Sequence, residues 1–177
     1  MEIPNWLLKQ ASLNPNRVAV NDGTTAYTFA QLVPLVAHRA GQIQAQTDQP
    51  RVGVMTHNNL AGYLAALGVL AADKTIVWLN WRLAPEELSR QIGDAGLDLV
   101  LVDDQLADRY YGGHRVLCSE LTAGTAPAAV LTPTVDLDAV ASIMYTSGTT
   151  GQPKGVLQTY GNHLASAISS SLNLGVY

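Results

Sequence analysis

The residues of this chain that could do chemistry gather in one segment, residues 145–156. It reads Tyr-Thr-Ser-Gly-Thr-Thr-Gly-Gln-Pro-Lys-Gly-Val and directly follows an apolar run at 140–144. Glycines permit positive φ angles and close approach of the backbone, so successive N–H groups can point at one anion. Hydroxyl side chains add neutral donors, and Lys154, one of only three lysines in the chain, adds a positive charge. The segment therefore predicts a loop that wraps a phosphate chain.

This loop differs from the common P-loop, in which a Ser or Thr follows the lysine, binds Mg²⁺ and opens a helix. Here Gly155 follows Lys154, and Pro153 precedes it. Proline disfavours helical geometry at Gln152, and residues 156–158 have the composition of a strand. We predict a strand, a phosphate loop and a second strand. The alternative is a Gly/Thr surface hairpin with a solvated lysine, but such a hairpin needs only one or two special residues.

The segment resembles the signature loop of the acyl-adenylate-forming superfamily, which includes acyl-CoA synthetases, luciferases and the adenylation domains of peptide synthetases. Hydroxyls, glycines, proline and lysine agree with that loop in order and spacing over residues 146–155. Segments 26–32 and 79–88 resemble strand-to-helix passages of the same superfamily. Residues 143–145 and 158–163 are most similar to the o-succinylbenzoate–CoA ligases of menaquinone biosynthesis, since many fatty-acyl ligases have a histidine where Tyr160 stands here.

The resemblance implies a reaction in two steps. A carboxylate, here o-succinylbenzoate, attacks the α-phosphate of ATP to give an acyl-adenylate, and coenzyme A then displaces AMP to give a thioester. It implies catalytic roles for Thr146 and for Lys154, which neutralises the departing pyrophosphate. It implies Mg²⁺ on the phosphates but assigns no metal ligand to these residues. The nucleotide-binding residues that it implies are Thr146, Ser147, Gly148, Thr149, Thr150, Gly151, Lys154 and Gly155.

Later motifs of the superfamily have no counterpart in these 177 residues. They are the aromatic-Gly-x-Thr-Glu segment, the aspartate that holds the ribose, and the C-terminal catalytic lysine. We therefore expect residues 1–177 to be the N-terminal portion of the superfamily's large domain, without the C-terminal lid domain and inactive alone. Its uncovered strand edges and helix faces favour self-association.

Alternatives to this reading remain open. The parent could be another acyl-CoA synthetase, or an adenylation domain of the peptide-synthetase type, which requires a carrier protein as partner. The chain could also be a complete, non-catalytic module that binds nucleotides or another protein.

Composition indicates an ordinary folded domain, with 47% apolar residues, 14% charged residues and a net charge of −4. The chain has no block of basic residues, so its sequence does not suggest a nucleic-acid-binding surface. No apolar run is long enough to span a bilayer, and the N-terminus lacks the basic region of a secretory signal. We expect a cytoplasmic protein. The single Cys118 excludes an internal disulfide, and we interpret it as a small buried apolar residue.

Other reactive residue types give weaker signals. The four histidines, His38, His57, His114 and His163, show no metal-ligand spacing with cysteine or carboxylates. We expect His163 to cap or pack in the first turn of the last helix. Ser147 lacks the Gly-x-Ser-x-Gly context of a hydrolase nucleophile. Glu86 and Glu87 lie in the first turn of a predicted helix, where the helix dipole favours negative charge, so they need no catalytic role.

Alternating elements must position the loop. Strands are predicted at 18–20, 26–28, 52–55, 75–79 and 97–102. A first helix is predicted at 4–13, with Pro4 in its first turn. A second helix follows a capping box of Thr28 and Gln31, and a third begins at Leu60. A fourth covers 88–95 and ends at Gly96. This succession predicts an α/β fold with a mainly parallel sheet covered by helices.

Three expectations concern irregular positions. Pro34 should kink the second helix or delay its start. Residues 121–134, rich in Ala, Thr, Pro and Gly, should form a linker or surface excursion. Thr159 should cap the last helix, in which Leu164, Ile168 and Leu172 form the stripe that faces the core.

Overall fold

The computed structural model describes residues 1–110, 112–121, 126–146 and 153–175. The helical elements are α1 (Trp6–Leu13), α2 (Phe29–Gln46), α3 (Leu60–Ala71), α4 (Pro85–Ala95), the 3₁₀ turn η1 (Asp104–Arg109) and α5 (Tyr160–Leu174). The strands are β1 (Glu2–Pro4), β2 (Val18–Asn21), β3 (Ala26–Thr28), β4 (Arg51–Met55), β5 (Thr75–Trp78), β6 (Val100–Val102), β7 (Arg115–Leu117), β8 (Thr134–Asp136), β9 (Val140–Thr146) and β10 (Lys154–Thr159).

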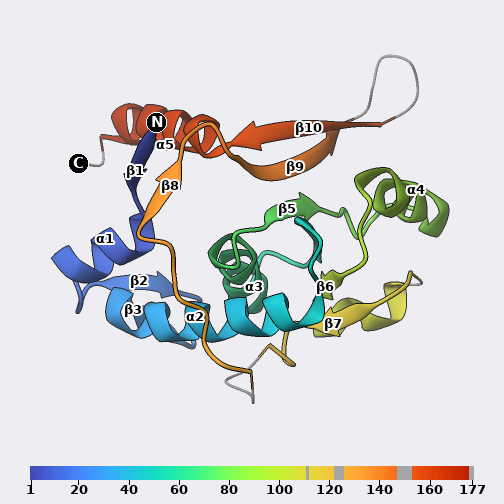
Figure 1. Ribbon diagram of the computed structural model, residues 1–177, viewed down its shortest axis with the longest axis horizontal. Helices are drawn as coiled ribbons and strands as arrows, with labels where there is room; N and C mark the ends of the chain where they lie inside the picture. The colour runs from blue at the N-terminus through green and yellow to red at the C-terminus, as the bar shows by residue number, and fades with distance from the viewer. Residues whose placement is uncertain (111, 122–125, 147–152, 176–177) are drawn as a thin grey trace.

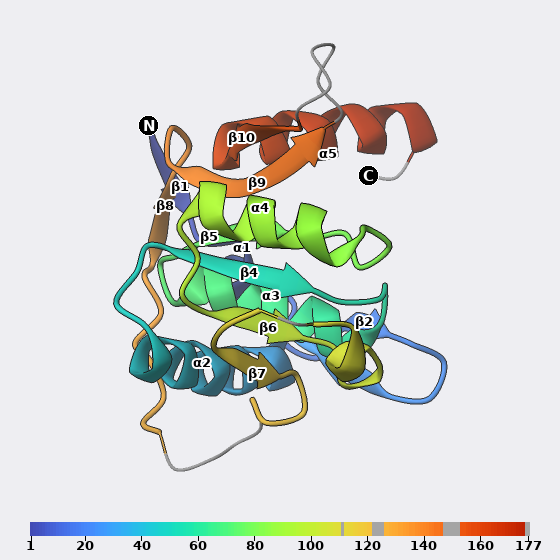
Figure 2. The same cartoon turned by 90° about the vertical axis from the view of Figure 1, so that its right-hand side faces the viewer.

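A six-stranded sheet forms the centre of the molecule, in the order β10-β9-β5-β4-β6-β7. The pairs β9–β5, β5–β4, β4–β6 and β6–β7 are parallel, and only β10 runs antiparallel, beside β9. Figures 1 and 2 show the sheet with helices packed against it. The prediction of a mainly parallel sheet covered by helices is confirmed. The antiparallel strand is the one that follows the predicted phosphate loop.

Each face of the sheet has its own hydrophobic core. Helices α2 and α3 cover one face, where Ile43 and Val69 pack on Val52 and Leu101. Helix α4 and η1 cover the other face, where Leu88 joins a cluster that includes Val77, Val100 and Ile143. Figure 1 shows α3 and α4 on opposite sides of the strands. The apolar stripe predicted for α2 is confirmed, because its members are all at most 1% exposed: Leu32, Val36, Ala40 and Ile43.

Local capping signals fix several helix ends as predicted. Thr28 Oγ accepts from the N–H of Gln31 at 3.3 Å, and the Gln31 side chain accepts from the N–H of Thr28 at 2.9 Å. Thr159 caps α5 in the same way with Asn162. Gly96 ends α4 at a φ of +63°, in the left-handed region that glycine adopts at little cost.

Two expectations about prolines are wrong in part. Pro4 lies in β1, which pairs with β8, and α1 begins only at Trp6. The helix starts there because the Asn5 side chain accepts from two N–H groups of its first turn. Pro34 does not delay α2, which begins at Phe29 and runs through it. The capping box of Thr28 and Gln31 fixes the helix start five residues ahead of Pro34.

The predicted strand at 97–102 is shorter than expected, since β6 begins at Val100. The predicted linker is irregular over 126–133 but packs on α2. The Ala129 N–H donates to Ala37 O at 2.9 Å, and a Cβ at Gly41 would lie 1.9 Å from Pro127 O. The excursion therefore crosses the back of α2, and only a glycine at position 41 permits that approach.

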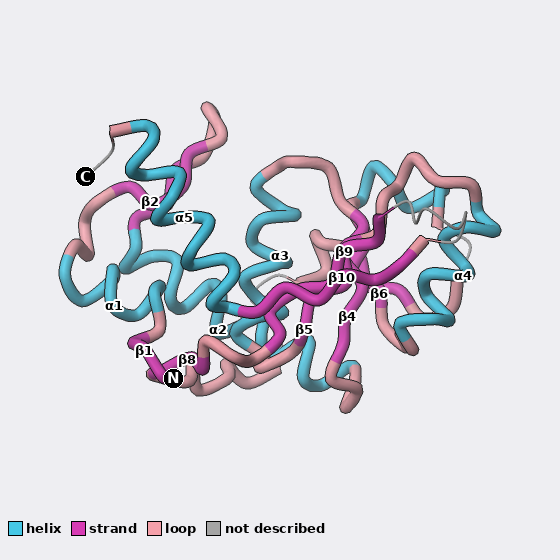
Figure 3. The backbone as a smooth tube through the Cα atoms, turned by 90° about the horizontal axis from the view of Figure 1, so that it is seen from above, coloured by secondary structure: helices cyan, strands magenta, loops and turns pink. Residues whose placement is uncertain are grey.

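The expectation that α5 buries an apolar stripe is wrong. Leu164 is only half-buried, while Ile168 and Leu172 are 51% and 63% exposed. Figure 3 shows α5 running away from the strands of the sheet, and no described element covers its outer side. The stripe lies in a helix as its spacing predicts, but spacing does not reveal whether another element is present to cover it.

Candidate functional site

Strands β9 and β10 form an antiparallel hairpin that carries the predicted phosphate loop. Tyr145 pairs with Gly155, and Thr146 pairs with Lys154 at the last position before the loop. Directly opposed residues of such a pair have Cβ atoms about 4.5–5.5 Å apart. The structure thus brings the two predicted catalytic residues, Thr146 and Lys154, together across one hairpin, and both are exposed.

The remaining predicted binding residues of the loop lie outside the described part of the chain. They are Ser147, Gly148, Thr149, Thr150 and Gly151, and their assignment stays a prediction. The two strands on either side of the loop are confirmed, so both of its ends are placed on one hairpin.

Gly155 has a packing reason to be glycine. A Cβ at this position would lie 3.1 Å from Ile143 Cγ2 and 3.5 Å from Tyr145 Cζ. The first of these distances is tighter than ordinary carbon–carbon contact. The Tyr145 ring therefore lies close over the backbone of the opposite strand. The sequence suggested Gly155 only as a residue that approaches phosphates.

The hydroxyl of Tyr145 connects this hairpin to α4. It donates to Asp94 Oδ2 at 2.5 Å and lies 3.3 Å from Gln91 O. Burial, followed by the hydrogen bond to Asp94 and its charge, raises the pKa of Tyr145 far above the usual range. This contact is not predictable from the sequence, because Asp94 lies 51 positions before Tyr145 and no local pattern links the two residues.

A cavity of about 280 Å³ lies between α4 and the end of the hairpin. Gln91 is 6% exposed, and its Oε1 finds no hydrogen-bond partner among the described residues. Glu87, which shares this helix face, accepts from the Ala84 N–H at 3.2 Å, as expected for a carboxylate in a first helical turn. The cavity is lined by Glu87, Arg90, Gln91, Asp94, Tyr145 and Pro153.

Polar contacts also hold the base of the hairpin. The buried Ser142 Oγ lies 3.0 Å from Gln158 Oε1 and 3.0 Å from His163 Nε2. The Tyr160 N–H donates to Ala139 O at 3.0 Å. As expected, His163 packs in the first turn of α5, and its partner proves to be a buried serine of β9. The register of β9 against β10 and α5 is therefore fixed at this end.

A second group of polar side chains lies at the carboxyl ends of β4 and β6. Asp103 is 3% exposed, and its Oδ2 accepts from Asn59 Nδ2 at 2.7 Å and from the His57 N–H at 3.2 Å. The His57 ring Nδ1 lies 3.2 Å from the same oxygen. Burial acts to raise the pKa of Asp103, but hydrogen bonds from Gln105, Asn59 and His57 outweigh it and lower the pKa.

The loop after β5 adds an indole to this group. The Trp81 and His57 ring centroids lie 4.9 Å apart, and the guanidinium of Arg82 lies 4.3 Å from the indole centroid. Arg109 approaches the same ring at 5.5 Å. The sequence does not predict this group, because its members come together only through the order of the parallel strands.

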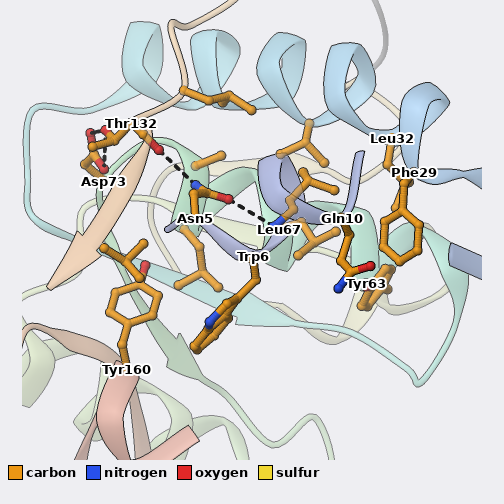
Figure 4. Close-up of a pocket in the computed structure, with 16 residues that line it drawn as sticks. Asn5, Trp6, Gln10, Phe29, Leu32, Tyr63, Leu67, Asp73, Thr132 and Tyr160 are labelled. Carbon is orange, nitrogen blue, oxygen red and sulfur yellow. Dashed lines mark hydrogen bonds between the residues drawn. The ribbon is translucent and has the colours of Figure 1, made fainter. Parts of the chain in front are cut away.

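Apolar pockets lie on the α3 side of the sheet. One of about 250 Å³ is shown in Figure 4, with Tyr160 at one end, Phe29 at the other and Trp6 between them. A larger pocket of about 760 Å³ lies beside it and is lined in part by Trp6, Tyr63 and His163. Neither pocket is lined by the residues at the end of the hairpin, so they are separate from the phosphate-loop site.

Among the residues that the structure describes, no group of three or more His, Cys, Asp or Glu could hold a metal ion. No helix within the described ranges is long and apolar enough to cross a membrane.

Comparison with known proteins places these features in context. A family model described as AMP-binding enzyme matches residues 7–176. The 2-succinylbenzoate–CoA ligase of Geobacillus sp. (strain WCH70) is 45% identical over 179 residues, which cover 98% of this chain and 36% of that relative. The chain therefore spans little more than a third of the length of this relative.

Solved structures agree over the whole chain. O-succinylbenzoate coenzyme A synthetase from Bacillus subtilis, in complex with AMP, matches with a TM-score of 0.91 at 34% identity. The match covers 100% of this chain and 48% of that structure. The same synthetase in complex with ATP and magnesium ion gives a TM-score of 0.89 at 32% identity, covering 100% of this chain and 49% of that one.

Proposed function

We propose that this chain, which belongs to the AMP-binding enzyme family, is part of an ATP-dependent acid–CoA ligase that acts on o-succinylbenzoate. The observation that supports the chemistry is the pairing of Thr146 with Lys154 at the mouth of a loop of glycines and hydroxyls. The choice of acid is supported by the relative that is 45% identical and named for this activity.

In the first step, a carboxylate oxygen of the acid attacks the α-phosphorus of ATP. The bond between that phosphorus and the bridging oxygen breaks, and pyrophosphate leaves with the bonding electrons. Catalysis of such a step depends on donors and cations held where charge develops. We assign this task to the backbone N–H groups of 147–151, the Thr146 hydroxyl and the Lys154 ammonium, with Lys154 placed to neutralise pyrophosphate.

In the second step, the thiol of coenzyme A attacks the acyl carbonyl of the adenylate, and AMP leaves. Mg²⁺, when bound, supplies further neutralisation of the phosphates. Within the described part of the chain no group of three or more His, Cys, Asp or Glu could hold this ion, and we assign it no ligand among these residues. We assign no residue of this chain to adenine, ribose, acid or coenzyme A. We also propose a cytoplasmic location, where ATP and coenzyme A are available.

The test uses the full-length protein that contains this chain. We expect pyrophosphate release that depends on o-succinylbenzoate, and AMP release once coenzyme A is added. A fatty acid of similar size serves as the control acid. Turnover of the fatty acid without turnover of o-succinylbenzoate would reject the substrate and keep the acid-activating chemistry. Failure to release pyrophosphate with any acid would reject both.

A further inference from the structure

We propose that Asp94 is a positioning residue for adenylate formation, because it holds the end of the β9–β10 hairpin on helix α4 through the Tyr145 hydroxyl. This inference rests on the proposed function, since it assigns a role in the same phosphate-loop site.

The hairpin projects beyond the rest of the sheet. Strand β5 pairs with β9 only at Ser142, Ile143 and Met144, so β9 has just β10 as a neighbour from Tyr145 onward. Figures 1 and 2 show the two strands extending past β5, with α4 directly below them. A two-stranded ribbon is at best marginally stable by itself. Its direction therefore depends on whatever ties it to the body of the domain.

The Tyr145 side chain provides that tie. Its ring lies against the backbone of Gly155, and its hydroxyl donates to Asp94 Oδ2 at 2.5 Å. One side chain thus contacts both stems of the hairpin and α4. Among the described residues, the Tyr145 hydroxyl makes the only side-chain hydrogen bonds from positions 145–146 and 153–155 to the rest of the molecule, to Asp94 and, at 3.3 Å, to Gln91 O.

Packing alone does not fix the hairpin on α4. The cavity of about 280 Å³ between Gln91, Asp94 and Pro153 leaves space beneath the stem. The helix itself is firmly placed, because Leu88 and Ala95 are buried in the core. A stem beside open space can tilt unless a directional bond holds it, and a hydrogen bond to a carboxylate is such a bond.

The consequence concerns Thr146 and Lys154, which form the next pair after Tyr145 and Gly155. A tilt of the stem would move both residues relative to the β- and γ-phosphates. Small displacements of positioning groups are costly, since a misplacement of about 1 Å can lower a rate by about a hundredfold. Asp94 would act on the reaction without touching the nucleotide.

The two half-reactions should respond differently. Adenylate formation requires the loop to hold the β- and γ-phosphates as pyrophosphate departs. Thioester formation starts from the acyl-adenylate, which has lost those phosphates. A change at Asp94 should therefore slow the first step and spare the second, whereas a general loss of folding would lower both.

The experiment uses the full-length protein and measures each half-reaction separately. Asp94→Ala and Tyr145→Phe should each slow acid-dependent ATP–pyrophosphate exchange by about tenfold, and the double variant should be no slower than either single one. Asp94→Asn keeps an acceptor oxygen and should restore most of the rate. All variants should form thioester from supplied acyl-adenylate at the wild-type rate. Tyr27→Phe, in β3 and outside the lining of the pockets described above, is the matched control and should match wild type.

Equal losses in both half-reactions, multiplicative effects in the double variant, or unchanged exchange in Asp94→Ala would each overturn the proposal. If wild-type protein forms no acyl-adenylate, the proposed function fails, but the attachment of the hairpin to α4 through the Tyr145 hydroxyl can still be tested. Amide hydrogen exchange at Gly155 should then be faster in Tyr145→Phe than in wild type. Unchanged exchange at this amide would overturn the inference by itself.

Discussion

Replacing Asp103 with alanine should be among the most destabilising single changes near the carboxyl edge of the sheet. The carboxylate is 3% exposed and accepts from the backbone N–H groups of Gln105 and His57, from the Asn59 side chain and from the His57 ring nitrogen, when that nitrogen is protonated. Alanine removes the acceptor from all of them. The Asn59 side chain also caps α3, since its Oδ1 accepts from Gly62 N–H at 2.8 Å.

The magnitude follows from the donors that lose their partner. A buried donor without an acceptor costs about 1–3 kcal/mol. His57 is 32% exposed, so water can replace part of what is lost there. Counting the Gln105 N–H, the His57 backbone N–H and the Asn59 side chain near the lower end of that range, we expect a loss of about 3 kcal/mol in the free energy of unfolding.

The loss should depend on pH with a definite sign. Because the pKa of Asp103 is lowered in the folded protein, its ionised form stabilises the fold above the unfolded pKa of about 3.9. That contribution disappears as the pH falls through the folded pKa. The difference between wild type and Asp103→Ala should therefore be full at neutral pH and should shrink below about pH 4.

Urea unfolding at pH 7 and in acid measures both effects. Asp108→Ala, an exposed aspartate of the same 3₁₀ turn, is the control and should change stability by less than about 0.5 kcal/mol. A loss in Asp103→Ala no larger than that of the control would refute the reasoning. A difference that grows in acid would show that the sign of the pKa shift is wrong.

Three further predictions concern single features. Burial raises the pKa of Cys118 from 9.0 to about 12, so the free energy of unfolding should fall as the pH rises through that range. In Cys118→Ala, urea unfolding should show that this part of the pH dependence is gone. Gly155→Ala should lower the free energy of unfolding by about 1–2 kcal/mol, because the added methyl overpacks the hairpin stem; an unchanged midpoint would contradict this. The side chains of Leu157 and Ile168 are 56% and 51% exposed. They lie in the segment 155–177, which contains no Asp, Glu, Lys or Arg. The 177-residue chain should therefore self-associate in light scattering, and Leu157→Lys with Ile168→Glu should be monomeric.

Sequence patterns predicted the parts of the fold that local interactions determine. The capping box of Thr28 and Gln31, the glycine end of α4 at Gly96 and the buried stripe of α2 each depend on residues a few positions apart. The strands on both sides of the loop followed from their apolar runs and from Pro153.

Contacts between distant residues could not be predicted in the same way. Tyr145 and Asp94 are 51 positions apart, and His57 and Asp103 are 46 apart. Each pair meets only because the strand order brings their elements together. Residues 2–4 have no strand pattern of their own and become β1 only through pairing with β8. The exposure of Ile168 likewise depends on what covers α5, which periodicity does not report.

The central claim is that the loop bounded by Thr146 and Lys154 binds the phosphates of ATP while an acid is activated. ATP–pyrophosphate exchange by the full-length protein tests it most directly, with o-succinylbenzoate as the acid and Lys9→Ala, a lysine of α1, as the control for Lys154→Ala. We predict exchange that requires the acid, is unchanged in Lys9→Ala, and falls by about a hundredfold or more in Lys154→Ala. Exchange without the acid, or equal exchange in wild type and Lys154→Ala, would contradict the claim.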